Sequence, residues 1–415
     1  MIFNNGMSIW ILAILVIGAT TLAGWRQGAI RAGISFIGIL FAILLAGLLG
    51  RLVHPLLPHL GASNPITAWA LAPVIGFILV SIVFAVAAQP VHKRVEHYYK
   101  YKAGDLRQAL WERLNTRVGI CIGVLNGAVY FILISFLVFN LSYWTTQVAT
   151  APKEPLLVRL VNNLGNDMES CGLTRTACAV GTLQPMFYQL ADLSGLLMQN
   201  PQIGGRLADY PGLMSLWERD DMQPLIQDST LTNAAAAGTT LGEIMNDPNV
   251  NSFLKNKELT KLVTGILQTN LSDLTNYLTT GKSPKYDGQK IIGLWNFDPA
   301  VTFAWMRQSQ PKMSGNEVRA IRAWIYQAYA GTHILVAGDN QVYVKHLPHP
   351  KVNPGPPPTT TTEYEDWKGE WTPNGTNYDL HVMLNGGEKF MTATAEDYRL
   401  TIKDGSTLMI FDRAD

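Results

Sequence analysis

Apolar positions are concentrated in the first third of the chain, where four long stretches carry no charged residue. They cover about residues 7–23, 32–50, 66–89 and 118–147. Each stretch comes near or above the ~20 apolar residues that cross ~30 Å of hydrocarbon. The pattern predicts a four-helix transmembrane bundle within residues 1–150, in a multidomain membrane protein.

The first stretch has a second interpretation, a cleaved signal peptide. Nothing basic precedes it, and its flanks lack a small-x-small cleavage site. We therefore interpret it as a membrane helix that stays in the protein.

The distribution of Lys and Arg predicts the orientation, because short loops rich in these residues stay in the cytoplasm. Arg26 and Arg31 lie in the first connection, whereas the second holds Arg51 alone. The third connection is strongly basic, with Lys93, Arg94, Lys100, Lys102, Arg107, Arg113 and Arg117. We expect a multi-pass protein of a bacterial inner membrane, with the N-terminus and all residues after the fourth helix in the periplasm.

Small residues recur at helical spacing in the membrane part. Gly119, Gly123 and Gly127 form two overlapping G-x-x-x-G spacings, and Gly24 and Gly28 form another. Such spacings let helix backbones approach closely. Asn126 adds a polar group that needs a partner in apolar surroundings. We expect these residues to pack the helices together; a contact between copies in a homo-oligomer and a lipid-headgroup site are the alternatives.

Three arginines flank the predicted helices at the inner surface: Arg26, Arg31 and Arg117. The first interpretation is that they anchor the helices at the membrane interface, with their aliphatic stems in the apolar region. The second is that they bind phospholipid headgroups. Membrane lipids are therefore expected partners in either case.

Two segments carry a family resemblance. Gly24-Trp-Arg-Gln-Gly28-Ala-Ile-Arg31 resembles a glycine–basic–glycine turn, and Leu114 to Gly127 resembles a helix rich in small residues. Both are similar to the colicin V production protein (CvpA) family, over about residues 7–147. The resemblance implies a four-helix inner-membrane protein linked to toxin production or export and to envelope homeostasis. Family members sometimes carry a serine protease, but this chain has no G-x-S-x-G or G-D-S-G turn.

The remainder divides by composition. Residues 151–287 show apolar positions at spacings of three and four between short breaks, which predicts an all-α periplasmic region. Residues 288–415 hold short alternating runs separated by turn residues, which predict one small antiparallel β-barrel or sandwich. We expect the Pro- and Thr-rich segment 348–362 to form a long loop within it.

The order of motifs in the last region resembles bacterial lipocalin-like domains. The relevant residues are Gly293-Leu-Trp295, Gly369-Glu-Trp371 and the closing Phe411 and Arg413. A small barrel either fills its interior with side chains or holds one apolar ligand. Trp295, Trp305, Trp324 and Trp371 are candidates to line such a pocket, with a place in the packed core as the alternative.

Cys171 and Cys178 are a candidate disulfide in an oxidising compartment, with two unbridged thiols as the alternative. We identify no metal site, cofactor site or catalytic group, because no set of ligands or nucleophiles occurs at a suitable spacing. The near balance of 32 basic and 31 acidic residues argues against nucleic acid.

These observations predict a non-enzymatic inner-membrane scaffold that presents periplasmic domains to a periplasmic or inner-membrane protein partner. The alternative is a carrier of lipid or apolar peptide that uses the C-terminal barrel. A transporter is disfavoured, because the four apolar stretches hold no ionisable acidic or basic residue to couple ions.

Overall fold

The computed structural model describes residues 7–61, 64–102, 104–149, 153–181, 183–353, 359–384, 387–405 and 407–414. The chain forms two compact units. The first consists of Met1–Pro201 and Gln227–Thr260, and the second of Gln202–Ile226 and Lys261–Asp415. The predicted helical region 151–287 thus contributes to both units, and each unit is described separately below.

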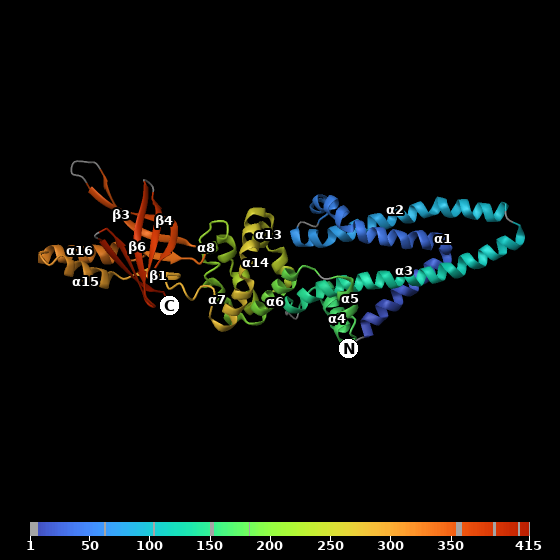
Figure 1. The fold of residues 1–415 in the computed structure, drawn as a ribbon, viewed down its shortest axis with the longest axis horizontal. Helices are drawn as coiled ribbons and strands as arrows, with labels where there is room; N and C mark the ends of the chain where they lie inside the picture. Colours follow the sequence, from blue (N-terminus) through green and yellow to red (C-terminus); the bar gives the residue numbers. More distant parts are fainter. Residues whose placement is uncertain are drawn as a thin grey trace. The chain divides into compact units, whose positions relative to one another are not determined.

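Within the described residues, three helices are long and apolar enough to cross a membrane. They are α1 (Met7–Val53), α2 (Pro65–Tyr101) and α3 (Asp105–Val148), with a 3₁₀ segment, η1 (His54–Leu60), after α1. The first two predicted stretches lie in the single helix α1. Gly28 interrupts that helix with a φ of 75° and a ψ of 172°, and Figure 1 shows a sharp bend there.

The basic connection at residues 91–117 is mostly helical, because α2 and α3 extend into it from both sides. Within its described residues, Lys102 and Gly104 are the only positions outside these helices. α2 begins where the Asn64 side chain accepts hydrogen bonds from the backbone N–H groups of Ile66 and Thr67, with Pro65 at the first helical position. Pro73 and Pro90 lie inside α2 without ending it.

Shorter helices complete the first unit. They are α4 (Leu156–Ser170), α5 (Thr174–Val180), α6 (Pro185–Gln199), α10 (Ser229–Thr232), α11 (Ala234–Ala237), α12 (Leu241–Asn246), α13 (Pro248–Lys255) and the start of α14 (Lys257–Thr280). The start of α1 packs on α3 and α4, where Ile9, Val138, Leu164 and Met168 form a buried apolar cluster. This cluster ties α4, which the sequence analysis placed in the periplasmic region, to the membrane helices.

The second unit holds η2 (Pro201–Ile203, from its second residue), α7 (Gly204–Ala208), α8 (Met214–Trp217), α9 (Gln223–Ile226), the rest of α14 and a β-barrel. The strands are β1 (Gly293–Phe297), β2 (His333–Val336), β3 (Gln341–Asn353), β4 (Thr359–Asn374), β5 (Asn377–Leu384), β6 (Gly387–Ala395), β7 (Arg399–Asp404) and β8 (Thr407–Arg413). Helices α15 (Pro299–Ser309) and α16 (Gly315–Ala328) separate β1 from β2.

In the described part of the chain, these strands form a closed barrel in their sequence order, with antiparallel pairing between neighbours. The barrel closes where β1 pairs with β8. Alternate residues point inward, as expected for strands, and Trp295, Leu380, Val382, Ile402 and Phe411 are buried. The C-terminal region is therefore a barrel rather than a sandwich.

The prediction of a loop over residues 348–362 is wrong for most of that segment. Residues Pro348–Asn353 belong to β3 and Thr359–Thr362 belong to β4, and the two segments pair with each other. Threonine is a favourable strand residue, so the segment continues the pairing of β3 with β4. Pro354, Pro356, Pro357 and Pro358 lie outside the described residues.

A polar network joins α14 to the segment before the barrel. The Tyr210 hydroxyl donates a hydrogen bond to Asp273 at 2.8 Å, and the Ser283 hydroxyl donates to the same carboxylate at 2.6 Å. Tyr210 is fully buried. Burial, with the hydrogen bond to Asp273, raises the pKa of Tyr210. The backbone N–H of Gly338 in the β2–β3 turn donates to the carbonyl of Pro211 at 2.9 Å. The chain next to Tyr210 therefore also contacts the barrel.

Candidate functional site

The predicted glycines lie at one close contact between the first half of α1 and α3. A Cβ atom at Gly119 would lie 2.5 Å from the carbonyl oxygen of Gly24, and one at Gly123 would lie 2.6 Å from that of Thr20. A Cβ at Gly127 would lie 2.7 Å from the Cα of Ile17. Only glycine fits such separations, so the glycines let two backbones touch.

Asparagine side chains on α3 bind the backbone of α1 beside this contact. Asn126 donates from its side-chain amide to the carbonyl of Ala32 at 3.2 Å. One turn before Gly119, the Asn115 side-chain oxygen accepts a hydrogen bond from the N–H of Ala29 at 2.8 Å. A Cβ at Gly28 would collide with the Asn115 side chain. The bend in α1 is therefore held from α3.

The three arginines predicted as lipid-headgroup candidates have different surroundings in the structure. Arg26 and Arg117 are exposed, whereas Arg31 is half-buried. The Nε atom of Arg31 is buried and has no hydrogen-bond partner among the described residues. His92 on α2 is also buried, and its Nε2 lies 3.7 Å from Glu96.

Comparison with protein families relates this part of the chain to a known family. Residues 9–165 match the family model of the colicin V production protein. The part of the chain that holds this match is called the colicin V production domain below. No curated protein matches the chain, and no solved structure does.

The colicin V production domain extends beyond the stretch that carried the resemblance, because the match reaches residue 165, inside α4. Helix α4 packs on the other helices of the match. Gly165 lies against Ser142 of α3, where a Cβ would collide with the serine side chain. Leu164 and Met168 belong to the apolar cluster with Ile9, so α4 completes the core of the domain.

The predicted disulfide lies at the end of α4 and is not formed in the described part of the chain. Cys171 packs against the apolar cluster of the colicin V production domain, whereas Cys178 is exposed on α5. The two thiols thus have different surroundings.

The four tryptophans predicted as pocket candidates do not line one pocket. Trp295 and Trp371 are buried at one end of the barrel, where their indole N–H groups donate to the carbonyls of Ile291 and Ala337 at 2.8 and 2.9 Å. The Arg413 guanidinium lies 4.4 Å from the ring centre of Trp295 and closes this end. Trp305 and Trp324 lie on α15 and α16 instead.

The opposite end of the barrel has a groove of about 710 Å³. Lys389 forms an ion pair with Asp404 there, and its Nζ lies 5.5 Å from the ring centre of Trp367. Tyr329, Leu347 and Met409 are among the other lining residues. Among the described residues, no group of three or more His, Cys, Asp or Glu side chains could hold a metal ion.

Sequence reasoning missed Asn115 as a contact of the bend. It lies eight positions before Gly123 in the same segment that carries the family resemblance, so its proximity to the glycines was visible. Its partner was not, because a backbone N–H becomes available only where Gly28 breaks the helix.

Proposed function

We propose that the chain is a non-enzymatic inner-membrane scaffold of the colicin V production family, which presents its second unit to a periplasmic or inner-membrane protein partner. The role is linked to toxin production or export, or to envelope homeostasis. The observation that carries the proposal is the family match over residues 9–165, joined in one chain to a second compact unit with a closed barrel.

The bend at Gly28 supports four membrane crossings by three helices. α1 has 47 residues, and at ~1.5 Å per residue it would be roughly 70 Å long if straight, far more than ~30 Å of hydrocarbon. The halves before and after Gly28 each have about the length of one crossing. α2 and α3 supply the other two.

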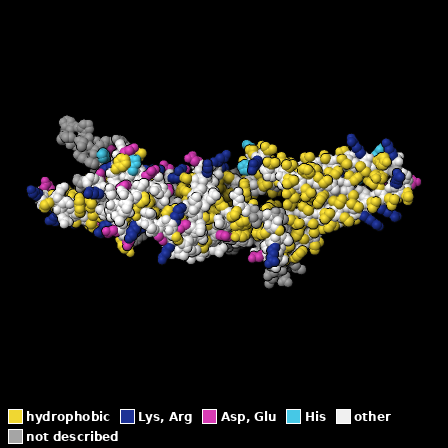
Figure 2. Space-filling model, in the orientation of Figure 1, with side chains coloured by type: hydrophobic (Ala, Val, Ile, Leu, Met, Phe, Trp, Pro, Cys, Tyr) yellow, Lys and Arg dark blue, Asp and Glu magenta, His cyan; other side chains and the backbone are white. Residues whose placement is uncertain are grey.

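Surface charge supports the orientation. In Figure 2 the surface of α1 to α3 is largely apolar, and Lys and Arg gather at the end where α2 meets α3. The positive-inside tendency puts this end in the cytoplasm. The second unit is then periplasmic.

Labelling of introduced cysteines tests this topology. Cys121, Cys171 and Cys178 would be replaced by Ser, and Arg26→Cys, Lys100→Cys, Gly61→Cys and Asp397→Cys made one at a time. In intact spheroplasts, a membrane-impermeant maleimide should label Gly61→Cys and Asp397→Cys. The other two should react only after permeabilisation. Arg26→Cys that stays unreactive in both states would indicate a single crossing by α1.

Complementation tests the scaffold role. In a deletion strain of the host that makes colicin V, we expect the full chain to restore toxin in the medium, and a chain that ends at Gly288 to fail while it still reaches the membrane. Equal activity of both versions would show that the barrel presents nothing that toxin production needs.

The groove at the open end of the barrel favours a second candidate function, a carrier of lipid or apolar peptide. Its volume of about 710 Å³ is in the range of small-molecule sites. Met409→Trp would obstruct the groove, whereas Met383→Trp would add the same side chain at an exposed position of β5. A carrier should bind a fluorescent apolar probe, and only the first variant should lose it.

A further inference from the structure

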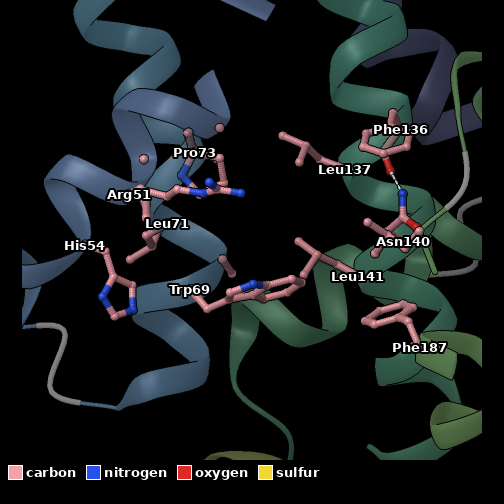
Figure 3. A pocket seen from close by; sticks show the side chains of 16 residues that line it. Arg51, His54, Trp69, Leu71, Pro73, Phe136, Leu137, Asn140, Leu141 and Phe187 are labelled. Atoms are coloured by element: carbon pink, nitrogen blue, oxygen red, sulfur yellow. Dashed lines mark hydrogen bonds between the residues drawn. The ribbon is translucent and has the colours of Figure 1, made fainter. Parts of the chain in front are cut away.

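A second hollow lies in the first unit, away from the glycine contact. It is a crevice of about 700 Å³ between the end of α1, the first turns of α2 and the second half of α3. Figure 3 shows Arg51 and Trp69 extending from one wall and Leu137 and Leu141 from the other. Phe187 of α6 lies below them. All of these residues belong to the first unit.

The walls of the crevice are apolar, and the protein's own side chains do not fill the space between them. Trp69 keeps 58% of its surface exposed and Leu141 keeps 46%. A Cβ atom at Gly47, which also lines the crevice, would meet nothing within 4 Å. The neighbouring glycines differ, because a Cβ at Gly50 would lie 3.0 Å from the backbone of Pro73. The helices are therefore in contact beside the crevice and apart within it.

The polar side chains of the crevice differ in whether they have hydrogen-bond partners. Asn140 is already satisfied, since its amide donates to Phe136 at 2.8 Å and its oxygen accepts from the Tyr188 hydroxyl at 2.8 Å. Arg51 and His54 form no hydrogen bond or ion pair with any described residue. No Asp or Glu lines the crevice. Its electrostatic character is thus that of a single fixed positive charge beside an apolar slot.

We propose that this crevice binds one phospholipid with an anionic headgroup, whose phosphate pairs with Arg51 and whose acyl chain lies between Trp69 and Leu141. Arg51 lies in the last turn of α1, directly after the predicted membrane span 32–50, so its charge would lie at headgroup depth. Its planar guanidinium suits a phosphate. Basic pockets between membrane helices hold anionic headgroups at the cytoplasmic surface, and Arg51 would supply the same charge at the opposite surface. The inference depends on the membrane placement of α1 to α3 and not on the scaffold role.

Native mass spectrometry of the full chain, released from vesicles with equal phosphatidylglycerol and phosphatidylcholine, tests the proposal. We expect one retained phosphatidylglycerol, favoured about tenfold over phosphatidylcholine, a preference equal to ~1.4 kcal/mol. Arg51→Gln should remove that preference, whereas Arg113→Gln, at an exposed position of α3, should keep it. Arg51→Lys should keep part of it.

A pair of glycine variants tests the acyl-chain part. Gly47→Phe should fill the slot and abolish the retained lipid of either kind. Gly18→Phe is the matched control, because Gly18 is also exposed on α1 with nothing within 4 Å of a Cβ. Lipid retention that is unchanged in both Arg51→Gln and Gly47→Phe would overturn the proposal. Loss in Arg51→Gln alone would also overturn it, since only a surface headgroup contact would remain. So would a lipid-free dimer that Gly47→Phe dissociates, which would identify a second copy as the occupant.

Discussion

The backbone N–H of Ala29 donates a hydrogen bond to the side-chain oxygen of Asn115 at 2.8 Å. The bond joins the residue after the bend in α1 to the first half of α3, 86 positions away in the chain. It satisfies a backbone group that the break at Gly28 removes from the helical ladder. The bend is therefore a tertiary feature that depends on both helices.

Replacement of Gly28 by Ala should destabilise the membrane domain. The φ of 75° with a ψ of 172° is a region that only glycine adopts readily, and a Cβ would also collide with Asn115. We expect a loss of about 2 kcal/mol or more. Thermal unfolding in detergent would measure it, with Gly18→Ala as the control that keeps or raises the stability. An unchanged midpoint for Gly28→Ala would contradict the bend.

Replacement of Gly123 by Ala should separate α1 from α3. The added methyl group would lie 2.6 Å from the carbonyl oxygen of Thr20, and backbone atoms must shift to admit it. The expected loss is about 1–3 kcal/mol. Gly33→Ala in α1 is the control, because a Cβ at Gly33 would lie 3.8 Å from the side chain of Ile122 in α3, an ordinary contact. Equal unfolding midpoints for the two variants would show that the glycine contact does not decide the packing.

Replacement of Arg413 by Leu should loosen the closed end of the barrel. The guanidinium donates to the carbonyls of Ile292 and Lys290 at 3.2 and 2.7 Å and covers the ring of Trp295. We expect amide hydrogen exchange in β1 and β8 to accelerate, with a loss of about 2 kcal/mol in local stability. Arg399→Leu, which removes an exposed ion pair with Asp412 at 3.6 Å, should change exchange little.

The barrel should lose stability in acid through Asp366. Burial alone would raise the pKa of this carboxyl, but hydrogen bonds from the His346 N–H and the Lys345 ammonium outweigh it and lower the pKa. A lowered folded pKa contributes stability above the unfolded value, near pH 4, which is lost as the pH falls through the folded value.

Thermal melts of the full chain between pH 6 and pH 3 would measure the effect. Asp366→Asn should melt lower than the parent at pH 6 and lose less on acidification. In a Lys345→Met background the same substitution should cost less, because one of the bonds is already absent. An equal fall in melting temperature from pH 6 to pH 3 for the parent and Asp366→Asn would show that Asp366 does not cause the loss of stability in acid.

The apolar stretches were predictable because apolar length is a local property, although the first two lie in the single helix α1. The strand regions were predictable because alternation is also local. The extent of α2 and α3 was not, since residues 91–117 are polar and were expected to leave the helix. Charge sets the side of the membrane without ending a helix. The membership of α4 in the membrane domain was also missed, because its apolar face meets α3 and α1 only in the fold.

The C-terminal barrel was predicted as one of two architectures, and only the pairing of β1 with β8 distinguishes them. That contact joins residues more than a hundred positions apart, so no local pattern reports it. Helix α15 was also missed, although its start is a local signal: the Asp298 side chain accepts hydrogen bonds from the backbone N–H groups of Ala300 and Val301.

The pairing of Trp295 with Arg413 also means that the barrel begins and ends at one point on its circumference. The order of strands around the circle is therefore independent of where the chain is cut. A circular permutant that links Arg413 to Ile292 and opens the β4–β5 turn between Asn374 and Asn377 would retain every strand neighbour. The module is thus a ring whose point of attachment to the rest of the protein can be moved by design.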